Sequence, residues 1–332
     1  MHDVKHRTVE ANGIRMHVAE QGEGPAVLLC HGFPETWYAW RHQLPALAQA
    51  GFRAIAPDLR GFGGSDRPAD AGRYSLLHLV GDAVGLLDAL QIPSAIIIGN
   101  DWGATLAWQA ARLRPDRFRG VVASSVPMMG RAPLPPGKLF PATDEALFYT
   151  LYFQEPGVAE AELEADVRLA LRKILFAASG DAGPRVEGDG TPNPFGMVSR
   201  RDGLLAPLPA PATLPPWLSE ADLDVYAAAF TESGFRGGLN LYRSLDRNWE
   251  VDAALQGMKV TVPALYLVGE RDVGLTIPGM RQIMDGMPAL VPDLRGTITL
   301  PECGHWIQQE QPAAYNAAVL PFLQRLRAEA AS

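Results

Sequence analysis

The chain has 332 residues, 47% of them hydrophobic and 20% charged, which is the composition of a globular protein rather than a disordered one. A formal net charge of −8 offers no basic surface to nucleic acid or to an anionic membrane. Two cysteines are too few for a disulfide framework. Because there is no signal-peptide pattern and no apolar run near the roughly 20 residues of a membrane span, we expect a cytoplasmic protein with a small partner.

Six short apolar runs alternate with longer amphipathic segments, which is typical of a parallel sheet covered by helices on both faces. The predicted strands cover residues 26–32, 52–58, 94–101, 118–126, 263–270 and 296–305. Apolar residues at steps of three and four predict helices over 76–91 and 103–115. The sequence therefore predicts the α/β class with a mostly parallel sheet.

The alternation of strands and helices stops after residue 127 and resumes after residue 250. Between these points proline and glycine cluster around helix-like runs at 157–178 and 219–234, with a long loop over 182–203. We interpret 128–250 as a mainly helical insertion, or cap. The α/β core would then consist of residues 1–127 and 251–332.

The stretch "GNDWGA" places Asp101 between an apolar strand and a helical run, with Gly99 and Gly103 two residues away on either side. This spacing is typical of a nucleophile elbow, a sharp turn that raises the central side chain above the sheet. An aspartate between a strand and a helix is also a common helix N-cap. The motif by itself leaves both interpretations open.

The loop "HGFPETW" (31–37) follows the first predicted strand. Such a loop can offer the backbone N–H of Phe33 to a developing oxyanion, together with the N–H of Trp102 after the elbow. We expect His31 to orient this loop through hydrogen bonds and Pro34 to stiffen it. The sequence thus predicts an oxyanion hole next to Asp101.

Two further residues complete a possible catalytic set near the C-terminus. "PECGHW" puts His305 in a loop after the last predicted strand, and "LVGERDVG" puts Asp272 in the loop after the preceding one. Glu270 competes with Asp272, but Glu270 ends its strand whereas Asp272 lies beyond it. The order nucleophile, acid, histidine is the chain order of an α/β hydrolase.

Taken together, these stretches resemble epoxide hydrolases of the soluble type, which have the α/β-hydrolase fold. The likeness covers nearly the whole chain and includes "HGFPETWYAW", "APDLRGFGGSDRP", "GNDWGA", "LYFQEPGVAEAELEADV", "SGFRGGLNLYR" and "CGHW". The resemblance implies that Asp101 is the nucleophile, His305 the base and Asp272 its partner, with no cofactor and no metal. It departs from the family pattern at Asn100, where a histidine is usual.

The resemblance also implies that two tyrosines of the cap, Tyr149 and Tyr242, activate the epoxide oxygen. Tyr152 lies one helical turn from Tyr149, so spacing alone does not choose between them. Only the resemblance favours Tyr149.

The choice of a carboxylate nucleophile limits the chemistry. Attack on an ester would give an anhydride that reverts, whereas attack on a saturated carbon gives a stable ester, so Asp101 points to epoxides or alkyl halides. An opening epoxide needs a proton, which a tyrosine with a pKa of about 10 can supply, whereas a halide needs only N–H donors. We therefore expect an epoxide hydrolase that acts on a small hydrophobic epoxide.

The sequence leaves two alternatives to this function. A haloalkane or haloacid dehalogenase would share the Asp101, His305 and Asp272 set, and a non-catalytic small-molecule receptor would share only the fold. The sequence is equally compatible with a monomer and with a homodimer.

Overall fold

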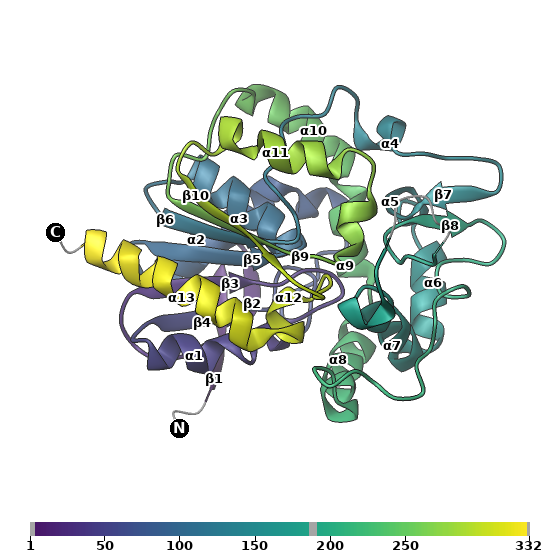
Figure 1. Cartoon of the computed structure of the whole chain (residues 1–332), viewed down its shortest axis with the longest axis horizontal. Coiled ribbons are helices and arrows are strands. Elements are labelled where there is room, and N and C mark those ends of the chain that lie inside the picture. The colour runs from purple at the N-terminus through teal and green to yellow at the C-terminus, as the bar shows by residue number, and fades with distance from the viewer. Residues whose placement is uncertain (1–3, 186–190, 331–332) are drawn as a thin grey trace.

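An eight-stranded sheet lies at the centre of the computed structural model, which describes residues 4–185 and 191–330 (Figure 1). The strand order is β1-β2-β4-β3-β5-β6-β9-β10. The strands are β1 (Lys5–Ala11), β2 (Ile14–Gln21), β3 (Ala26–Cys30), β4 (Arg53–Pro57), β5 (Ala95–Asn100), β6 (Phe118–Ser124), β9 (Ala264–Gly269) and β10 (Leu294–Leu300). From β4 to β10 every neighbouring pair is parallel, whereas β1 and β2 are antiparallel to their neighbours.

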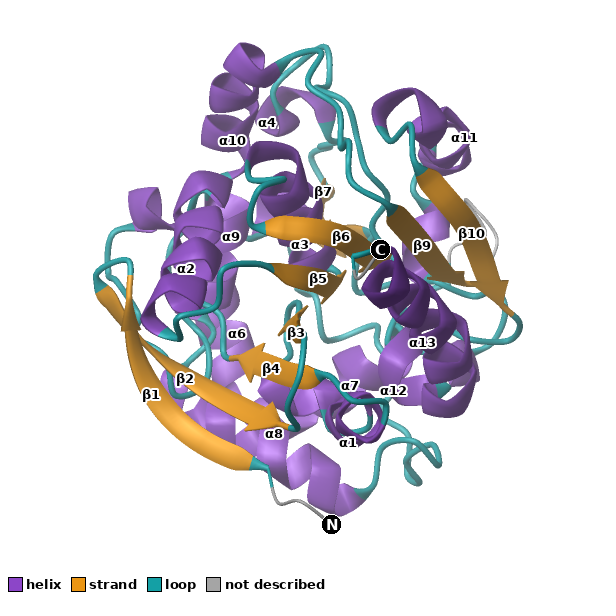
Figure 2. Ribbon diagram, turned by 90° about the vertical axis from the view of Figure 1, so that its left-hand side faces the viewer, coloured by secondary structure: helices purple, strands orange, loops and turns teal. Residues whose placement is uncertain are grey.

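Helices cover both faces of the sheet, as the edge-on view of Figure 2 shows. In β5, Ile97 belongs to a hydrophobic cluster shared with α2 (Leu76–Ala89) and α3 (Trp102–Leu113). Ile96 and Ile98 belong to a second cluster shared with α1 (Gln43–Gln49) and α13 (Pro312–Glu329). Alternate side chains of one strand therefore enter opposite cores, which confirms the predicted α/β class.

All six predicted core strands and both predicted core helices are present, with ends that differ by a few residues. The first two strands were not predicted. β1 is mostly exposed and reads "KHRTVEA", so it lacks the apolar run that marks the buried strands. Its pairing with β2 follows from the tight turn at Asn12 and Gly13, which both have positive φ.

The predicted cap segment, residues 128–250, contains mainly short helices. Its elements are α4 (Pro136–Leu139), β7 (Ala146–Phe148), α5 (Tyr149–Tyr152), α6 (Val158–Ala165), α7 (Val167–Ala177), β8 (Met197–Ser199), α8 (Glu220–Ser233), α9 (Arg236–Arg243) and α10 (Leu245–Asp252). The elements from β7 to α8 lie together beside one end of the sheet, at the right of Figure 1. The predicted boundary at residue 250 falls inside α10. The division into core and cap at these residues stays a prediction.

Two details of the cap differ from the sequence-based expectation. The prediction of one helical run over 157–178 is wrong, because two helices, α6 and α7, meet at Asp166. The side chain of Asp166 accepts the N–H of Leu169 and so caps α7. In the predicted loop over 182–203, β8 pairs with β7, while residues 186–190 lie outside the described residues.

Two further helices complete the C-terminal part of the chain, α11 (Met280–Leu290) and α12 (Ile307–Glu310). Short 3-10 turns lie at Trp37–Trp40, Ala71–Tyr74, Gly180–Ala182, Ala253–Leu255 and Val273–Thr276. Within residues 4–185 and 191–330, no helix is both long and apolar enough to cross a membrane.

Candidate active site

Asp101 stands at the end of β5, on the turn that leads into α3, with a φ of 53° and a ψ of −121°. A Cβ atom at Gly99 would collide with the carbonyl oxygen of Gly103, and one at Gly103 would collide with that of Cys30. Only glycine therefore fits on either side of this turn. The Asp101 side chain makes no capping hydrogen bond to α3, so the helix-cap interpretation of this carboxylate is wrong.

The two carboxylate oxygens of Asp101 face different partners. The backbone N–H of Phe33 donates to Oδ1 at 2.8 Å, and Nε2 of His305 lies 3.5 Å from Oδ2. The loop can approach this closely because residue 32 is glycine, where a Cβ would collide with Asp101. The N–H of Trp102 lies in the first turn of α3, where amide groups have no partner within the helix.

The third member of the predicted set, Asp272, lies against the other side of the His305 ring. Its Oδ1 is 3.0 Å from Nδ1 of His305 and also accepts the N–H of Gly274 at 2.8 Å. Glu270, the competitor, is exposed and accepts the N–H of Glu302 instead. The structure thus brings Asp101, His305 and Asp272 together in a buried row.

The two carboxylates dominate the electrostatics of His305. Burial lowers its pKa, but Asp272 and Asp101 raise it by more, so that the net pKa lies well above the ordinary value. For Asp272, burial raises the pKa, but His305 and the N–H of Gly274 lower it to a net value below the ordinary one. Among the described residues, Nε2 of His305 is a buried nitrogen without a hydrogen-bond partner.

Tyr149 and Tyr242 reach the same place from two helices of the cap segment, α5 and α9. Their ring centroids are 5.7 Å apart, and the Tyr242 ring is 5.1 Å from that of Trp102, next to Asp101. Burial first and the charge of Asp101 second raise the pKa of both tyrosines. Both hydroxyls therefore keep their protons at neutral pH and can act as donors.

The hydroxyls of the neighbouring tyrosines are already engaged. Tyr152 donates to Oε2 of Glu162 at 2.6 Å, and Tyr226 donates to Oε1 of Gln309 at 2.9 Å. Within the described part of the chain, the Tyr149 hydroxyl makes no such hydrogen bond. The geometry therefore favours Tyr149 over Tyr152, which spacing could not do.

Comparison with known proteins places this chain in a family. Residues 25–170 match the family described as the alpha/beta hydrolase fold. The chain is 43% identical to epoxide hydrolase A of Mycobacterium tuberculosis, over 96% of this chain and 97% of that protein, and 41% identical to epoxide hydrolase 2 of Siraitia grosvenorii, over 98% and 100%. The structure of an epoxide hydrolase from an endophytic Streptomyces matches with a TM-score of 0.90 at 43% identity, covering 98% of this chain and 96% of that one.

The chain belongs to the epoxide hydrolase family. Its fold is therefore the α/β-hydrolase fold, as the resemblance implied. No group of three or more side chains in the described residues is arranged to hold a metal ion.

Asn100 stands where the resemblance led us to expect a histidine, and it joins β5, the strand before the elbow, to the loop of His305. Its Nδ2 donates to the carbonyl oxygen of His305 at 3.3 Å, and its Oδ1 accepts the hydroxyl of Ser125 at 3.1 Å. Ser125 also lies 3.0 Å from that same carbonyl. Asn100 thus contacts the backbone of His305 rather than any reacting side-chain atom.

Glu35, a fully buried carboxylate in the loop of Phe33, was not among the residues predicted from the sequence. It accepts the N–H of Gly32 at 3.1 Å and the side-chain amides of Gln308 at 3.0 Å and Gln309 at 2.7 Å. Burial raises the pKa of Glu35 to about 7, although the Gly32 N–H lowers it. The only signal in the sequence was an acidic residue inside "HGFPETW", which is equally typical of a surface turn.

The Glu35→Gln variant is expected to show a weaker pH dependence of stability than the wild type. The pKa of Glu35 rises from its ordinary value of 4.5 to about 7 on folding, so its contribution to stability is complete below pH 4.5 and is lost as the pH rises through about 7. Denaturant unfolding of both proteins at several pH values across this window measures the slope.

A matched control for this comparison is Glu250→Gln, since Glu250 is exposed on the surface of α10. This variant measures how far the substitution itself changes the slope. Equal slopes for Glu35→Gln and the wild type would contradict the assigned pKa.

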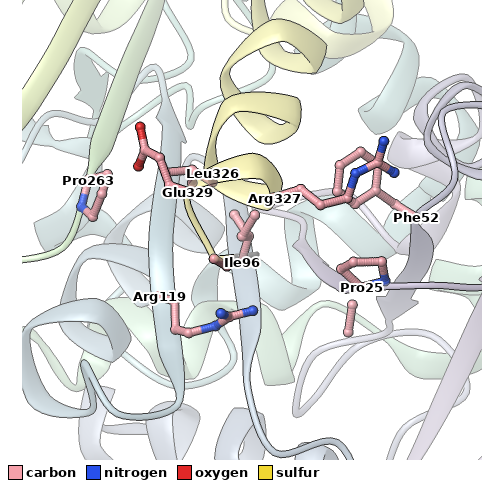
Figure 3. Close-up of a pocket in the computed structure, with 10 residues that line it drawn as sticks. Pro25, Phe52, Ile96, Arg119, Pro263, Leu326, Arg327 and Glu329 are labelled. Carbon is pink, nitrogen blue, oxygen red and sulfur yellow. The ribbon is translucent and has the colours of Figure 1, made fainter. Parts of the chain in front are cut away.

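A hollow of about 470 Å³ lies at the amino ends of the parallel strands, on the opposite side of the sheet from Asp101 along the strand direction (Figure 3). It is lined where β3, β5 and β6 begin, by residues such as Ala26, Ile96 and Arg119, and by the end of α13. Asp101 follows the carboxyl end of β5, the edge at which α/β proteins bind their ligands. The hollow is therefore not part of the candidate active site of this epoxide hydrolase.

Proposed function

We propose that this protein adds water to a small hydrophobic epoxide and releases a vicinal diol, through an ester formed on Asp101. The observation that carries the proposal is a buried carboxylate on an elbow, with a histidine nitrogen 3.5 Å away and two protonated tyrosines close enough to feel its charge. The names of the relatives, epoxide hydrolases at 43% and 41% identity over nearly the whole chain, support the same reaction.

In the first half of the reaction, Oδ2 of Asp101 attacks a carbon of the epoxide and the bond from that carbon to the ring oxygen breaks. Tyr149 and Tyr242 donate to the ring oxygen, and one of them supplies the proton that makes it a hydroxyl. Oδ1 stays on the N–H of Phe33 and becomes the carbonyl oxygen of the ester.

In the second half, His305 takes a proton from water, whose oxygen attacks Cγ of Asp101. The N–H groups of Phe33 and Trp102 stabilise the negative charge that develops on Oδ1. Collapse of this intermediate breaks the bond from Cγ to the substrate oxygen, and His305 returns its proton to the leaving diol. The second proton of the water remains on the Asp101 carboxyl group and passes to the tyrosinate left by ring opening, which restores both residues. Asp272 holds the imidazole and stabilises its charged form.

The charge of Asp101 links the two halves. While Asp101 is a carboxylate, it raises the pKa of His305 and favours the imidazolium. Ester formation removes that charge, so the pKa of His305 falls just when a neutral base is needed. The charge state of Asp101 thus determines when His305 becomes a neutral base.

The proposal extends to the parts of the molecule around this site. Residues 128–250 act as a cap that supplies both tyrosines, and the two buried free cysteines fit a cytoplasmic location. Because every residue of the proposed site belongs to one chain, a monomer and a homodimer would be equally competent.

The experiment that tests the proposal uses two substrates. The protein is incubated separately with styrene oxide and with a bromoalkane, and diol and bromide are assayed. We expect diol and no bromide. Bromide without diol would replace the proposal with a dehalogenase, and neither product would favour the non-catalytic receptor.

The double variant Tyr149→Phe/Tyr242→Phe is expected to alkylate Asp101 at least about a hundredfold more slowly, because no acid remains for the ring oxygen. Each single variant should lose less, since the other tyrosine still donates. Single-turnover kinetics with styrene oxide measure the rate. Tyr152→Phe is the control, because its hydroxyl is engaged by Glu162, and an unchanged rate in the double variant would refute the tyrosine roles.

A further inference from the structure

Glu310, at the end of α12, holds three backbone N–H groups with one carboxylate. Its Oε2 accepts from Gly180 at 2.9 Å and from Gly304 at 2.7 Å, and its Oε1 accepts from Trp306 at 2.9 Å. Burial raises the pKa of Glu310 to about 7, although these three N–H groups lower it. In its ionised form the carboxylate makes hydrogen bonds about twice as strong as those between neutral groups. This carboxylate takes no part in the reaction steps proposed above.

Two of these three donors are the neighbours of His305 in the chain. Gly304 and Trp306 lie immediately before and after it, so Glu310 fixes the backbone on both sides of the proposed base. The third donor, Gly180, belongs to the turn that follows α7. One side chain therefore ties the histidine loop to the cap segment.

Further contacts join the same two segments. The N–H of His305 donates to the carbonyl of Ala178 at 3.0 Å, and the indole N–H of Trp306 donates to that of Leu175 at 2.8 Å. These carbonyls belong to the C-terminal end of α7, where helix carbonyls lack partners within the helix. The end of a cap helix is thus completed by the loop that carries the base.

The two backbones meet with no room for side chains. A Cβ at Gly304 would collide with Gly180 and Ser179, and a Cβ at Gly180 would collide with the carbonyl of Glu302. Since the backbones are in direct contact, a displacement of either segment would be transmitted to the other.

We propose that Glu310 is a positioning residue for His305: it fixes the histidine loop to the end of α7 and so sets the place of Nε2 opposite Asp101. This inference rests on the proposed function. Ester hydrolysis depends on that placement, because Nε2 must lie within hydrogen-bond distance of the attacking water to take its proton. Alkylation, by contrast, needs only Asp101 and the two tyrosines. Glu310 therefore acts on the second half of the reaction.

The test compares Glu310→Gln with Glu250→Gln, the same substitution at an exposed position of α10. The glutamine amide keeps the shape of Glu310 but turns one acceptor into a donor that faces an N–H group. For Glu310→Gln we expect alkylation by styrene oxide within about twofold of wild type, and hydrolysis of the ester slower by about tenfold or more. The ester should accumulate during turnover and appear as added mass on the intact protein.

Glu310→Asp keeps the carboxylate on a shorter side chain, so it should hydrolyse the ester faster than Glu310→Gln but more slowly than the wild type. If Glu310→Gln does not fold, Glu310→Asp serves as the test variant. A lowered melting temperature with both rates unchanged would leave Glu310 purely structural and overturn the inference. An equal loss in both rates would overturn it as well. Failure of the wild type to form diol would instead refute the proposed function, so the two failures are distinguishable.

Discussion

The His305→Gln variant is expected to form the ester on Asp101 and then to stop, with diol production at least about a thousandfold below wild type. Glutamine is close to histidine in size, but its amide cannot take a proton from water. The attack by Asp101 uses Oδ2 and the two tyrosines, none of which this substitution changes. The first half of the reaction should therefore proceed without the second.

Mass spectrometry of the intact variant after incubation with styrene oxide measures the result. One substrate mass should be added to the protein, and a peptide that contains Asp101 should carry it. His78→Gln, in α2 away from the site, is the control and should behave as wild type. An unmodified variant that still binds substrate would count against covalent catalysis.

The Asp101→Ala variant should yield neither diol nor ester. Removal of the carboxylate deletes the only nucleophile and leaves the N–H of Phe33 without its acceptor. The charge that raises the pKa of His305 is lost too, so this pKa falls, and the histidine has no ester to hydrolyse. Binding of the substrate or of a diol should persist, because the tyrosines remain.

A double variant makes this prediction sharper. Asp101→Ala combined with His305→Gln should lose the added mass that His305→Gln alone carries, which would locate the ester on Asp101. Asp116→Ala, at an exposed aspartate, controls for the substitution itself. Added mass in the double variant would mean that another residue is the nucleophile.

The elements and residues that could be predicted from the sequence are those with local signals. The strand "AIIIGN" is buried on both faces, and a continuous apolar run reflects this directly. The elbow was visible because Gly99 and Gly103 are required by sterics within a few residues of Asp101. His305 and Asp272 followed from their places after consecutive strands of a parallel sheet.

The features that escaped prediction depend on contacts between distant parts of the chain. Glu35 meets Gln308 and Gln309 across 273 and 274 positions, and nothing near Glu35 indicates them. Glu310 likewise gains its importance from Gly180, 130 positions away. The break at Asp166 was local, but aspartate also occurs within helices, so the helical pattern on both sides concealed it.

The contact between the end of α7 and the histidine loop restricts how such enzymes could be recombined. In the proposed mechanism, the predicted cap supplies the acid for ring opening and the core supplies the residues for ester hydrolysis. An exchange of caps between relatives would then mainly change which epoxides are opened. The carbonyls of Leu175 and Ala178 and the N–H of Gly180, however, come from the cap side and hold the base in place. A chimaera would therefore keep full turnover only if residues 175–182 and the loop of His305 came from the same parent.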